Sequence, residues 1–398
     1  MLKKVKYNPI VVFAALLLCT VFLLYKQLPI GAVPQPTSSA NGQISISAVG
    51  DIMMPGSIQN AVAHHKFKYD LLFEKVAADL ATADITIANL ETTVDHESPV
   101  SGYPRFNARP ELLSALKNAG VGIVAVANNH IMDAGVYGLK RTLTNIEKAG
   151  LSFIGAGRTK AEADRIVYAT RRGITTAFLA FTYDTNAPLP RKKIDGPGVN
   201  ILRTNDETGL ERAAMVVRRA HQTADLVIVS IHWSDEYRME PTRWQRRTAA
   251  ALIESGADII LGHHPHVLQP IEFYRARDGR QGLISFSLGN FISSQNQGIS
   301  NDTRSQAKAL RGDGIILTII AVKENGKTSV KRADVLPIWT LREKVGQTVV
   351  YRPVSLLREI ARIEWKPKRS KEEENTLKLL GFRSKVINDM LKANARQQ

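Results

Sequence analysis

The stretch Ile259-Ile260-Leu261-Gly262-His263-His264-Pro265-His266 decides the fold of this chain, because a short apolar run passes directly into three imidazoles. The apolar half predicts a buried strand, and the histidines follow where that strand ends. In α/β proteins, binding sites collect at the carboxyl ends of strands. Imidazole is the commonest metal ligand among side chains, and the x-Pro-x spacing can aim His264 and His266 at one point. A histidine-rich surface loop is the alternative interpretation.

The chain from residue 44 onward alternates predicted strands with predicted helices. Short apolar runs predict strands over 44–49, 85–88, 121–127, 176–181, 226–231 and 259–261. Apolar residues at helical spacing, several with proline first or glycine last, predict helices over 71–80, 110–120, 139–149, 210–221 and 244–254. After His266, shorter spacing predicts strands over 267–273, 282–286, 315–322 and 329–335. This order predicts an α/β fold in which helices cover a mostly parallel sheet and a second sheet packs on the first.

Polar side chains follow five of the predicted strands directly. In chain order they are Asp51, Asn89 with Glu91, Asn129 with His130, His232, and His264 with His266. Carboxylate, amide and imidazole groups are the ligands that Zn²⁺, Mn²⁺ and Fe sites use. The single cysteine, Cys19, excludes a cysteine-based zinc site and an internal disulfide framework. A metal site at one edge of the sheet is therefore the prediction, with Glu91 as the best candidate to bridge two ions.

The residues at these strand ends also resemble the motifs of a known protein family. The chain resembles the CapA-type poly-γ-glutamate capsule biosynthesis family, a branch of the calcineurin-like metallophosphoesterase superfamily. The matching residues span about 44–292 and include Ala48-Val49-Gly50-Asp51, Ala88-Asn89-Leu90-Glu91-Thr92, Ala127-Asn128-Asn129-His130, His232-Trp233, Gly262-His263-His264-Pro265-His266 and Ser287-Leu288-Gly289-Asn290. The resemblance implies a metallophosphoesterase-like α/β-β/α sandwich, in which two packed mixed sheets are flanked by helices.

The resemblance also implies a role for each candidate residue. Two divalent metal ions are implied, with Mn, Fe or Zn as candidates. Asp51, Glu91 and His266 would hold the first ion. The second ion would be held by Glu91, Asn129, His232 and His264. His130 would be catalytic beside the metals, near the leaving group, and Asp133 would orient it as a carboxylate partner.

The sequence departs from the superfamily pattern at one predicted ligand position. The superfamily has a histidine two residues after the first aspartate, where this chain has Met53. We therefore expect the first metal site to be the weaker one. The additional histidine, His263, is expected to support the ligands.

Four further residues are candidates near the site. Asn89 is expected beside the ligands, and so is Glu236, although Glu236 also fits a solvated charge. Asn107 fits either a helix cap or an anion contact in the cleft. Asn290 fits either a turn or the lining of the cleft.

The first 43 residues predict export. Lys3, Lys4 and Lys6 precede the uncharged run 10–25, as in a signal or signal-anchor segment. We expect residues 1–33 to be an uncleaved single-pass membrane anchor, with cleavage as the alternative, and 34–43 to be a linker. The body would then lie on the extracytoplasmic side of the cell membrane. We expect a metallophosphoesterase-like domain over 44–340 and a basic helical extension over 341–398, with charged helices from residue 354.

The net charge of the chain indicates the chemical class of its partner. The net charge of +16 favours an acidic partner such as an anionic polymer, and export argues against nucleic acid. By resemblance, the function would be synthesis, export or anchoring of poly-γ-glutamate, with membrane synthase subunits as partners. The alternative is a metal-dependent phosphoesterase-type hydrolase of unknown substrate. A binding protein whose site has lost turnover is a third interpretation.

Overall fold

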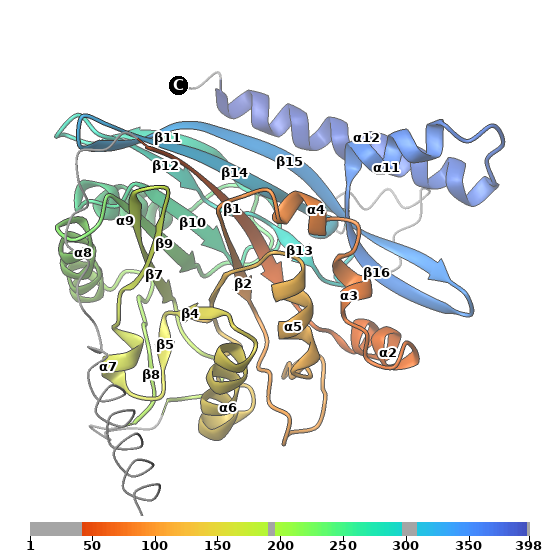
Figure 1. Ribbon diagram of the computed structural model, residues 1–398, viewed down its shortest axis with the longest axis horizontal. Helices are drawn as coiled ribbons and strands as arrows, with labels where there is room; N and C mark the ends of the chain where they lie inside the picture. The colour runs from red at the N-terminus through yellow and green to blue at the C-terminus, as the bar shows by residue number, and fades with distance from the viewer. Residues whose placement is uncertain (1–41, 190–195, 297–308, 396–398) are drawn as a thin grey trace, which may run out of the picture. The chain divides into compact units, whose positions relative to one another are not determined.

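The structure, a computed structural model, describes residues 42–189, 196–296 and 309–395. Two large mixed sheets flanked by helices form the folded body (Figure 1). This confirms the α/β class and the expected second sheet. The expected membrane anchor over 1–33 and nearly all of the expected linker lie outside the described residues. Within the described ranges, every helix is too short or too polar to cross a bilayer.

The first sheet is built around the long central strand β1. Its strand order is β16-β15-β14-β1-β2-β3-β4, and β13 pairs with the end of β1. The strands β1, β2, β3 and β4 are mutually parallel, whereas β14, β15 and β16 add on antiparallel. Their bounds are β1 Gly42–Ile52, β2 Ile85–Leu90, β3 Ile123–Ala125, β4 Ser152–Ile154, β13 Asn290–Ile292, β14 Asp313–Glu324, β15 Lys327–Val345 and β16 Thr348–Ser355.

The second sheet has the order β11-β12-β10-β9-β7-β6. Its four inner strands are parallel and its two edge strands are antiparallel. The inner strands are buried along almost their whole length, which explains why they read as continuous apolar runs in the sequence. The bounds are β6 Val167–Arg171, β7 Ile174–Thr182, β9 Leu226–His232, β10 Ile259–His263, β11 Ile271–Arg275 and β12 Gln281–Ser285, with a small separate pair β5 Ala156–Gly157 and β8 Gly198–Val199.

Alternating residues of the second sheet face two different cores. In β9, Leu226 and Ile228 join a core that includes Ile46 of β1, so this face packs against the first sheet. Val227 and Val229 point the other way, into a core with the helices α8 (Glu207–His221) and α9 (Arg243–Glu254). The first sheet is covered by α5 (Glu111–Asn118) and α6 (Gly135–Lys148), whose leucines belong to the shared core. The layers therefore run helix, sheet, sheet, helix.

The remaining described helices are short, apart from the 25-residue helix at the C-terminal end. Capping side chains define several starts; Thr242 and Gln245, for example, form a reciprocal capping box at α9. The single helix expected over 71–80 is wrong, because Val76 (φ −125°) leaves the helical region and separates two turns. The bounds are α2 Gly56–His64, α3 Asp70–Phe73, α4 Ala77–Leu80, α7 Lys160–Ala163, η1 Leu310–Gly312, α11 Leu356–Glu364 and α12 Lys371–Ala395.

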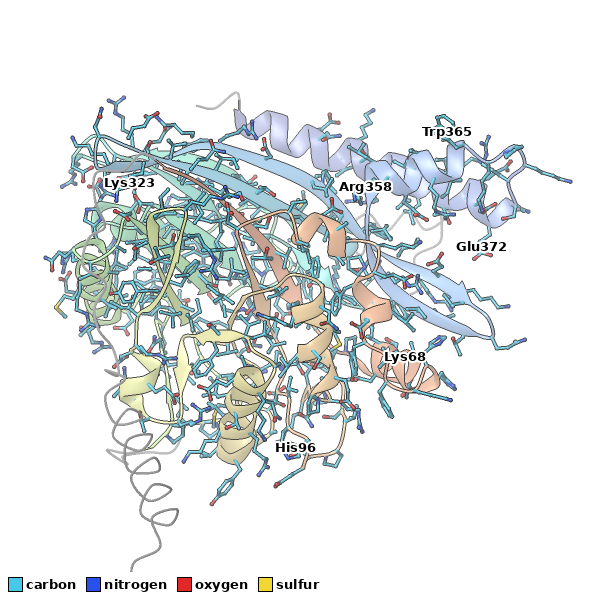
Figure 2. The ribbon with its side chains drawn as sticks, in the orientation of Figure 1. Lys68, His96, Lys323, Arg358, Trp365 and Glu372 are labelled. Carbon is cyan, nitrogen blue, oxygen red and sulfur yellow. The ribbon has the colours of Figure 1, made fainter. Side chains whose placement is uncertain are left out.

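The expected helical extension starts later than residue 341. The strand β15 continues to Val345, and β16 pairs with it antiparallel. Leu341, Val350 and Val354 are buried, so the alternating face of this hairpin belongs to the core. The helices expected from residue 354 are confirmed as α11 and α12, and Figure 2 labels Trp365 and Glu372, which flank the turn between them.

The helix α12 is docked on the sheets. Leu380 and Ile387 are buried in the shared core. The Arg383 guanidinium, 1% exposed, donates from Nε to Oδ1 of Asp313 in β14 at 2.9 Å and from Nη2 to Oδ2. A buried ion pair thus ties the C-terminal helix to the first sheet.

Asp258 lies between α9 and β10, and its raised pKa predicts that the stability of the fold depends on pH. Burial raises the pKa of Asp258 to about 7, against weaker opposing effects of the Val227 N–H bond and Arg280. Because the folded pKa lies above the unfolded value, this group stabilises the fold below about pH 4 and loses that contribution as pH rises through 7. At about 1.4 kcal/mol per pKa unit, the full loss is roughly 4 kcal/mol.

Asp258→Asn keeps an acceptor for Val227 but cannot ionise. We expect the variant to lack this fall in stability between pH 4 and 7, as measured by urea unfolding across that range. Equal pH slopes in the variant and the wild type would show that Asp258 ionises normally.

Candidate metal centre

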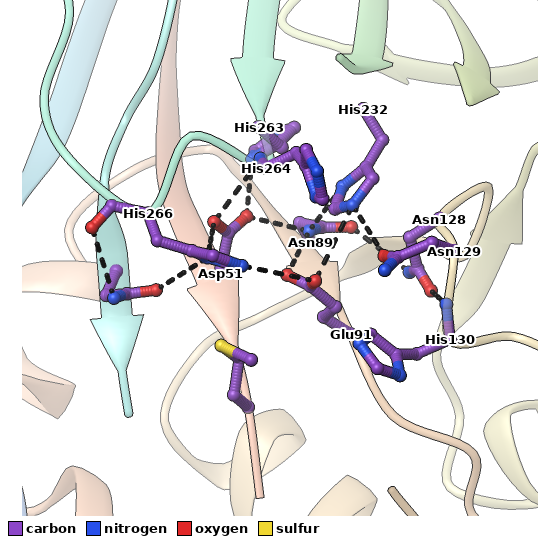
Figure 3. Close-up of polar contacts among 12 residues, drawn as sticks. Asp51, Asn89, Glu91, Asn128, Asn129, His130, His232, His263, His264 and His266 are labelled. Carbon is purple, nitrogen blue, oxygen red and sulfur yellow. Dashed lines mark hydrogen bonds and ion pairs between the residues drawn. The ribbon is translucent and has the colours of Figure 1, made fainter. Parts of the chain in front are cut away.

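The polar strand ends of the two sheets meet at one place (Figure 3). Asp51 lies at the end of β1, in register with Asn89 of β2, and Glu91 follows β2. His232 ends β9 and pairs in register with His263, which ends β10. The turn after β10 carries the last two predicted ligands. All of these residues are buried: Asp51, Asn89, Glu91, Asn129, His130, His232, His263, His264 and His266.

Two groups of these side chains could each hold a metal ion. One consists of Glu91, His264 and His266, and the other of Asp51, Glu91 and His232. Within each group the ligand atoms lie within 4.8 Å of one another. Glu91 belongs to both, as the predicted bridging role requires.

Buried side-chain atoms that lack a hydrogen-bond partner are consistent with a cation bound between the candidate ligands. Glu91 Oε1 and His264 Nδ1 are buried and have no hydrogen-bond partner among the described residues. Such atoms cost roughly 1–3 kcal/mol each when they stay unpaired, so buried polar groups usually have a partner. A divalent cation would provide one, and carboxylate and imidazole donors suit Zn²⁺, Mn²⁺ or Fe.

The electrostatics of the cluster also fit a cation. Burial raises the pKa of Asp51, but hydrogen bonds with His263 and His266 outweigh it and hold that pKa well below its usual range. Burial and then the charge of Asp51 raise the pKa of Glu91 well above its usual range. Burial and the neighbouring imidazoles lower the pKa of His232 and bring that of His264 to about 3. Both imidazoles are therefore neutral at pH 7, the form that binds metals.

The two ligand groups differ from the expected assignment of ligands to the two ions. The resemblance implied that His264 and His266 bind different ions, whereas here both lie in one group with Glu91. Asn129 lies beside the other group, with its Oδ1 2.9 Å from Nε2 of His232. The six predicted ligands are together, and which ion each would hold stays a prediction.

The turn after β10 is strained. His264 and His266 have φ values of 90° and 56°, in the left-handed region that residues other than glycine rarely adopt. Such conformations cost roughly 1–3 kcal/mol each and cluster at functional sites. The Tyr237 N–H donates to the Pro265 carbonyl at 2.8 Å, which helps to hold the turn.

Asp51 and Asn290 orient His266. Nδ1 of His266 lies 3.0 Å from Oδ2 of Asp51 and 3.2 Å from Oδ1 of Asn290. Since both are acceptors, Nδ1 carries the proton, and Nε2 is left toward Glu91 at 3.8 Å. Asn290 also donates to Gln295, which in turn contacts the sulfur of Met53 at 3.8 Å.

Asn89 connects the candidate ligands. Its Nδ2 lies 2.8 Å from Asp51 Oδ1, 3.4 Å from Glu91 Oε2 and 3.3 Å from His232 Nδ1. Asn128 was missed by sequence reasoning, although it stands in the Asn128-Asn129-His130 run. It donates to Asn89 Oδ1 at 3.3 Å and to the Leu90 carbonyl at 2.8 Å, and so fixes the Asn89 amide.

His130 and Asp133 form the expected pair. His130 Nδ1 lies 2.6 Å from Asp133 Oδ2, and the same oxygen accepts the Phe106 N–H at 2.7 Å. The Phe106 ring packs edge-on against the imidazole at 4.6 Å. Asn186, also missed by sequence reasoning, donates its backbone N–H to the Asn129 carbonyl at 2.8 Å, and its side chain contacts both Asn129 and His130. Its position shortly after β7 was the available signal.

A cavity of about 450 Å³ adjoins this pair. Glu236 is exposed and lines it, together with Tyr103, Pro104, Arg105, Asn129, His130, Asp133, Tyr183, Asn186, Ala187 and Pro188. Asn107 does not. Its amide is buried in hydrogen bonds with Asp95 and the carbonyls of Ser98 and Pro99, so it holds a loop together. Neither expected role applies, since Pro110 occupies the N-cap of α5.

Comparison with known proteins assigns the family. The family model described as "Bacterial capsule synthesis protein PGA_cap" matches residues 45–295, which include every candidate ligand. The chain belongs to this bacterial capsule synthesis family. The CapA-type resemblance stated from the sequence is thereby confirmed.

Two curated capsule synthesis relatives cover most of the chain. It is 33% identical over 280 residues to capsule biosynthesis protein CapA of Bacillus anthracis, which covers 69% of this chain and 66% of that protein. It is 32% identical over 317 residues to PGA biosynthesis protein CapA of Bacillus subtilis, with coverage of 78% and 80%. The chain thus spans just under two thirds of the first relative and four fifths of the second.

Two further similarities are weaker. A "probable polyglutamine synthesis accessory protein" of Mycobacterium tuberculosis is 29% identical over 201 residues, covering 49% of this chain and 53% of that protein. A crystal structure of a novel phosphatase from Mycoplasma pneumoniae aligns with a TM-score of 0.40 and 16% identity, over 75% of this chain and 95% of that one.

Proposed function

We propose that the protein is a membrane-anchored component of capsule synthesis, export or anchoring that works on poly-γ-glutamate with a metallophosphoesterase-like site for two metal ions. Family membership and the names of the relatives support the polymer. The net charge of +16 suits an acidic chain. The basic start and the uncharged run 10–25 support an anchor that leaves the body outside the cell membrane.

The observation that carries the metal-dependent part is the sharing of Glu91 between two ligand groups. Metal ions held there would polarise a substrate oxygen and activate water. In this chain, Nδ1 of His130 donates to Asp133, which leaves Nε2 to exchange a proton with a ligand in the adjoining cavity. Asn89 keeps the two carboxylates in place.

A second candidate is a phosphoesterase-type hydrolase that acts on a substrate other than the polymer. The His130–Asp133 pair at the cavity wall favours hydrolysis, because such a pair can transfer a proton to a leaving group. The two candidates share the metal centre and differ in substrate.

Complementation of a gene deletion tests the proposal. Cells that lack the gene should lose surface polyanion, and the full-length wild type should restore it. We expect His130→Asn to restore less than about a tenth, because general acid–base catalysis contributes roughly 100-fold or more. The control His64→Asn changes an exposed histidine on α2 and should restore polymer fully.

Equal protein levels, measured by immunoblot, make the comparison valid. Full polymer from His130→Asn would rule out a role for the site in capsule synthesis. In parallel, detergent-solubilised protein with Mn²⁺, Fe²⁺ or Zn²⁺ is assayed on a phosphodiester and on poly-γ-glutamate. Turnover of the phosphodiester alone, with unchanged capsule in the deletion strain, would favour the second candidate.

A further inference from the structure

We propose that Arg105 recognises a second anionic group of the substrate, so that the site favours a chain of repeated anions over a ligand with a single anion. This proposal rests on the proposed function and names a specificity residue for it. Arg105 lines the 450 Å³ cavity beside His130 and Asp133. A cavity of this size accommodates a ligand that reaches beyond the group at the metal centre.

The backbone of Arg105 is held firmly at the cavity wall. Its N–H donates to the Gly102 carbonyl at 3.1 Å, and its carbonyl accepts the Ser101 hydroxyl at 2.6 Å. The next residue, Phe106, donates its N–H to Asp133 and packs on His130. The turn that carries Arg105 is therefore connected directly to the His130–Asp133 pair, so the backbone from which the Arg105 side chain extends is fixed beside that pair.

The side chain of Arg105 is exposed and has no acidic partner among the described residues, whereas nearby arginines are paired. Arg109 contacts Glu111 at 3.0 Å, and Arg141 contacts both Asp95 and Glu97. A guanidinium offers a planar set of donors that matches a carboxylate or a phosphate in two parallel hydrogen bonds. Because no internal ion pair uses these donors, they are available to a ligand.

The charges of the cavity indicate where an anion can bind. Among the described residues that line it, Arg105 is the only lysine or arginine, and Asp133 and Glu236 are the acids. An anionic ligand is repelled by these two carboxylates and attracted at two places, the metal centre and Arg105. A polymer with one carboxylate per unit can satisfy both places at once, whereas a ligand with one anion satisfies only the first.

Binding measurements on the full-length protein in detergent with Mn²⁺ test this proposal. The probes are fluorescently labelled short poly-γ-glutamate and labelled polyphosphate, which distinguish a carboxylate from a phosphate. We expect Arg105→Gln to weaken binding of the preferred probe about 10-fold or more, as for loss of a charged hydrogen-bonding partner. Arg105→Lys should recover part of the affinity. Arg277→Gln, a matched loss of charge at a side chain that is 94% exposed, should change affinity less than about 2-fold.

The possible results separate this proposal from the proposed function. If the wild type binds poly-γ-glutamate and Arg105→Gln binds it as tightly as Arg277→Gln does, the role of Arg105 is wrong and the polymer stands. If binding is specific to polyphosphate and depends on Arg105, the anion role stands and the polymer is wrong. If the wild type binds neither probe, both are wrong. Unchanged melting temperatures show that the variants are folded.

Discussion

Replacing Glu91 with glutamine is expected to remove metal-dependent stabilisation of the protein. Glu91 is the one side chain common to both ligand groups, so a neutral amide there weakens every proposed metal contact. Loss of residues that only support a ligand costs 10–100-fold in metal affinity, and we expect at least about 100-fold here. At a metal concentration of 100 times the wild-type Kd, stabilisation would fall from about 2.7 to about 0.4 kcal/mol.

The measurement is thermal unfolding of the full-length protein with and without Mn²⁺, Fe²⁺ or Zn²⁺. Without metal, Glu91→Gln should be at least as stable as the wild type, because the two buried carboxylates of Asp51 and Glu91 no longer repel each other. Glu236→Gln is the control, since it neutralises a cavity carboxylate outside both ligand groups. Equal stabilisation of Glu91→Gln and the wild type by metal would refute the shared-ligand role.

Replacing Arg383 with methionine is expected to destabilise the fold by about 3–5 kcal/mol, the usual cost of removing one partner of a buried ion pair. Asp313 would remain buried in β14 without its two hydrogen bonds. Burial raises the pKa of Asp313 to about 6 even with Arg383 present. A carboxyl group whose folded pKa is raised destabilises the fold as pH rises through that pKa, so the loss should be larger at pH 8 than at pH 5.

Chemical unfolding of the variants measures this effect. The double variant Arg383→Met with Asp313→Asn should recover most of the stability, because no buried charge is left unpaired. Arg369→Met removes an exposed arginine ahead of α12 and should change stability by less than about 0.5 kcal/mol. A similar small loss for Arg383→Met would mean that the ion pair does not hold α12.

Much of the layered fold could be predicted because the inner strands are buried on both faces. The apolar runs at 226–231 and 259–261 became β9 and β10 within two residues, since continuous burial leaves a continuous apolar pattern. Parallel strands of one sheet bring their carboxyl ends to the same edge, which is why the candidate ligands could be named before their contacts were known. The sequence predicted one edge of a single sheet, whereas the ligands come from the strand ends of two sheets that meet. The bounds of β1 extend beyond the prediction because Gly42 and Gln43 also pair with β14.

The hairpin of β15 and β16 could not be predicted in the same way. Arg342 and Lys344 lie on its more exposed face, so half of its residues read as a solvated, charged segment. Which strand pairs with it depends on the distant strand β14. Contacts between the loops that follow strands could not be predicted either. Asn186 lies in the loop after β7 and contacts Asn129, and local sequence spacing does not determine which loops come together.

The assignment of ligands to individual ions was limited for a related reason. His264 and His266 both adopt left-handed backbone conformations, which turn their rings in a direction that a His-x-His spacing does not reveal. Asn107 illustrates the reverse case. Its sequence position suggested a cap or a cleft contact, whereas a loop that folds back over it uses its whole amide.

The most direct test of the metal centre is an anomalous difference map from crystals of the protein grown with Mn²⁺. We predict a peak at bonding distance from Glu91, shared either with His264 and His266 or with Asp51 and His232, and two such peaks at full occupancy. Peaks bound only to other residues, or no peak at a Mn²⁺ concentration that stabilises the protein, would contradict the account.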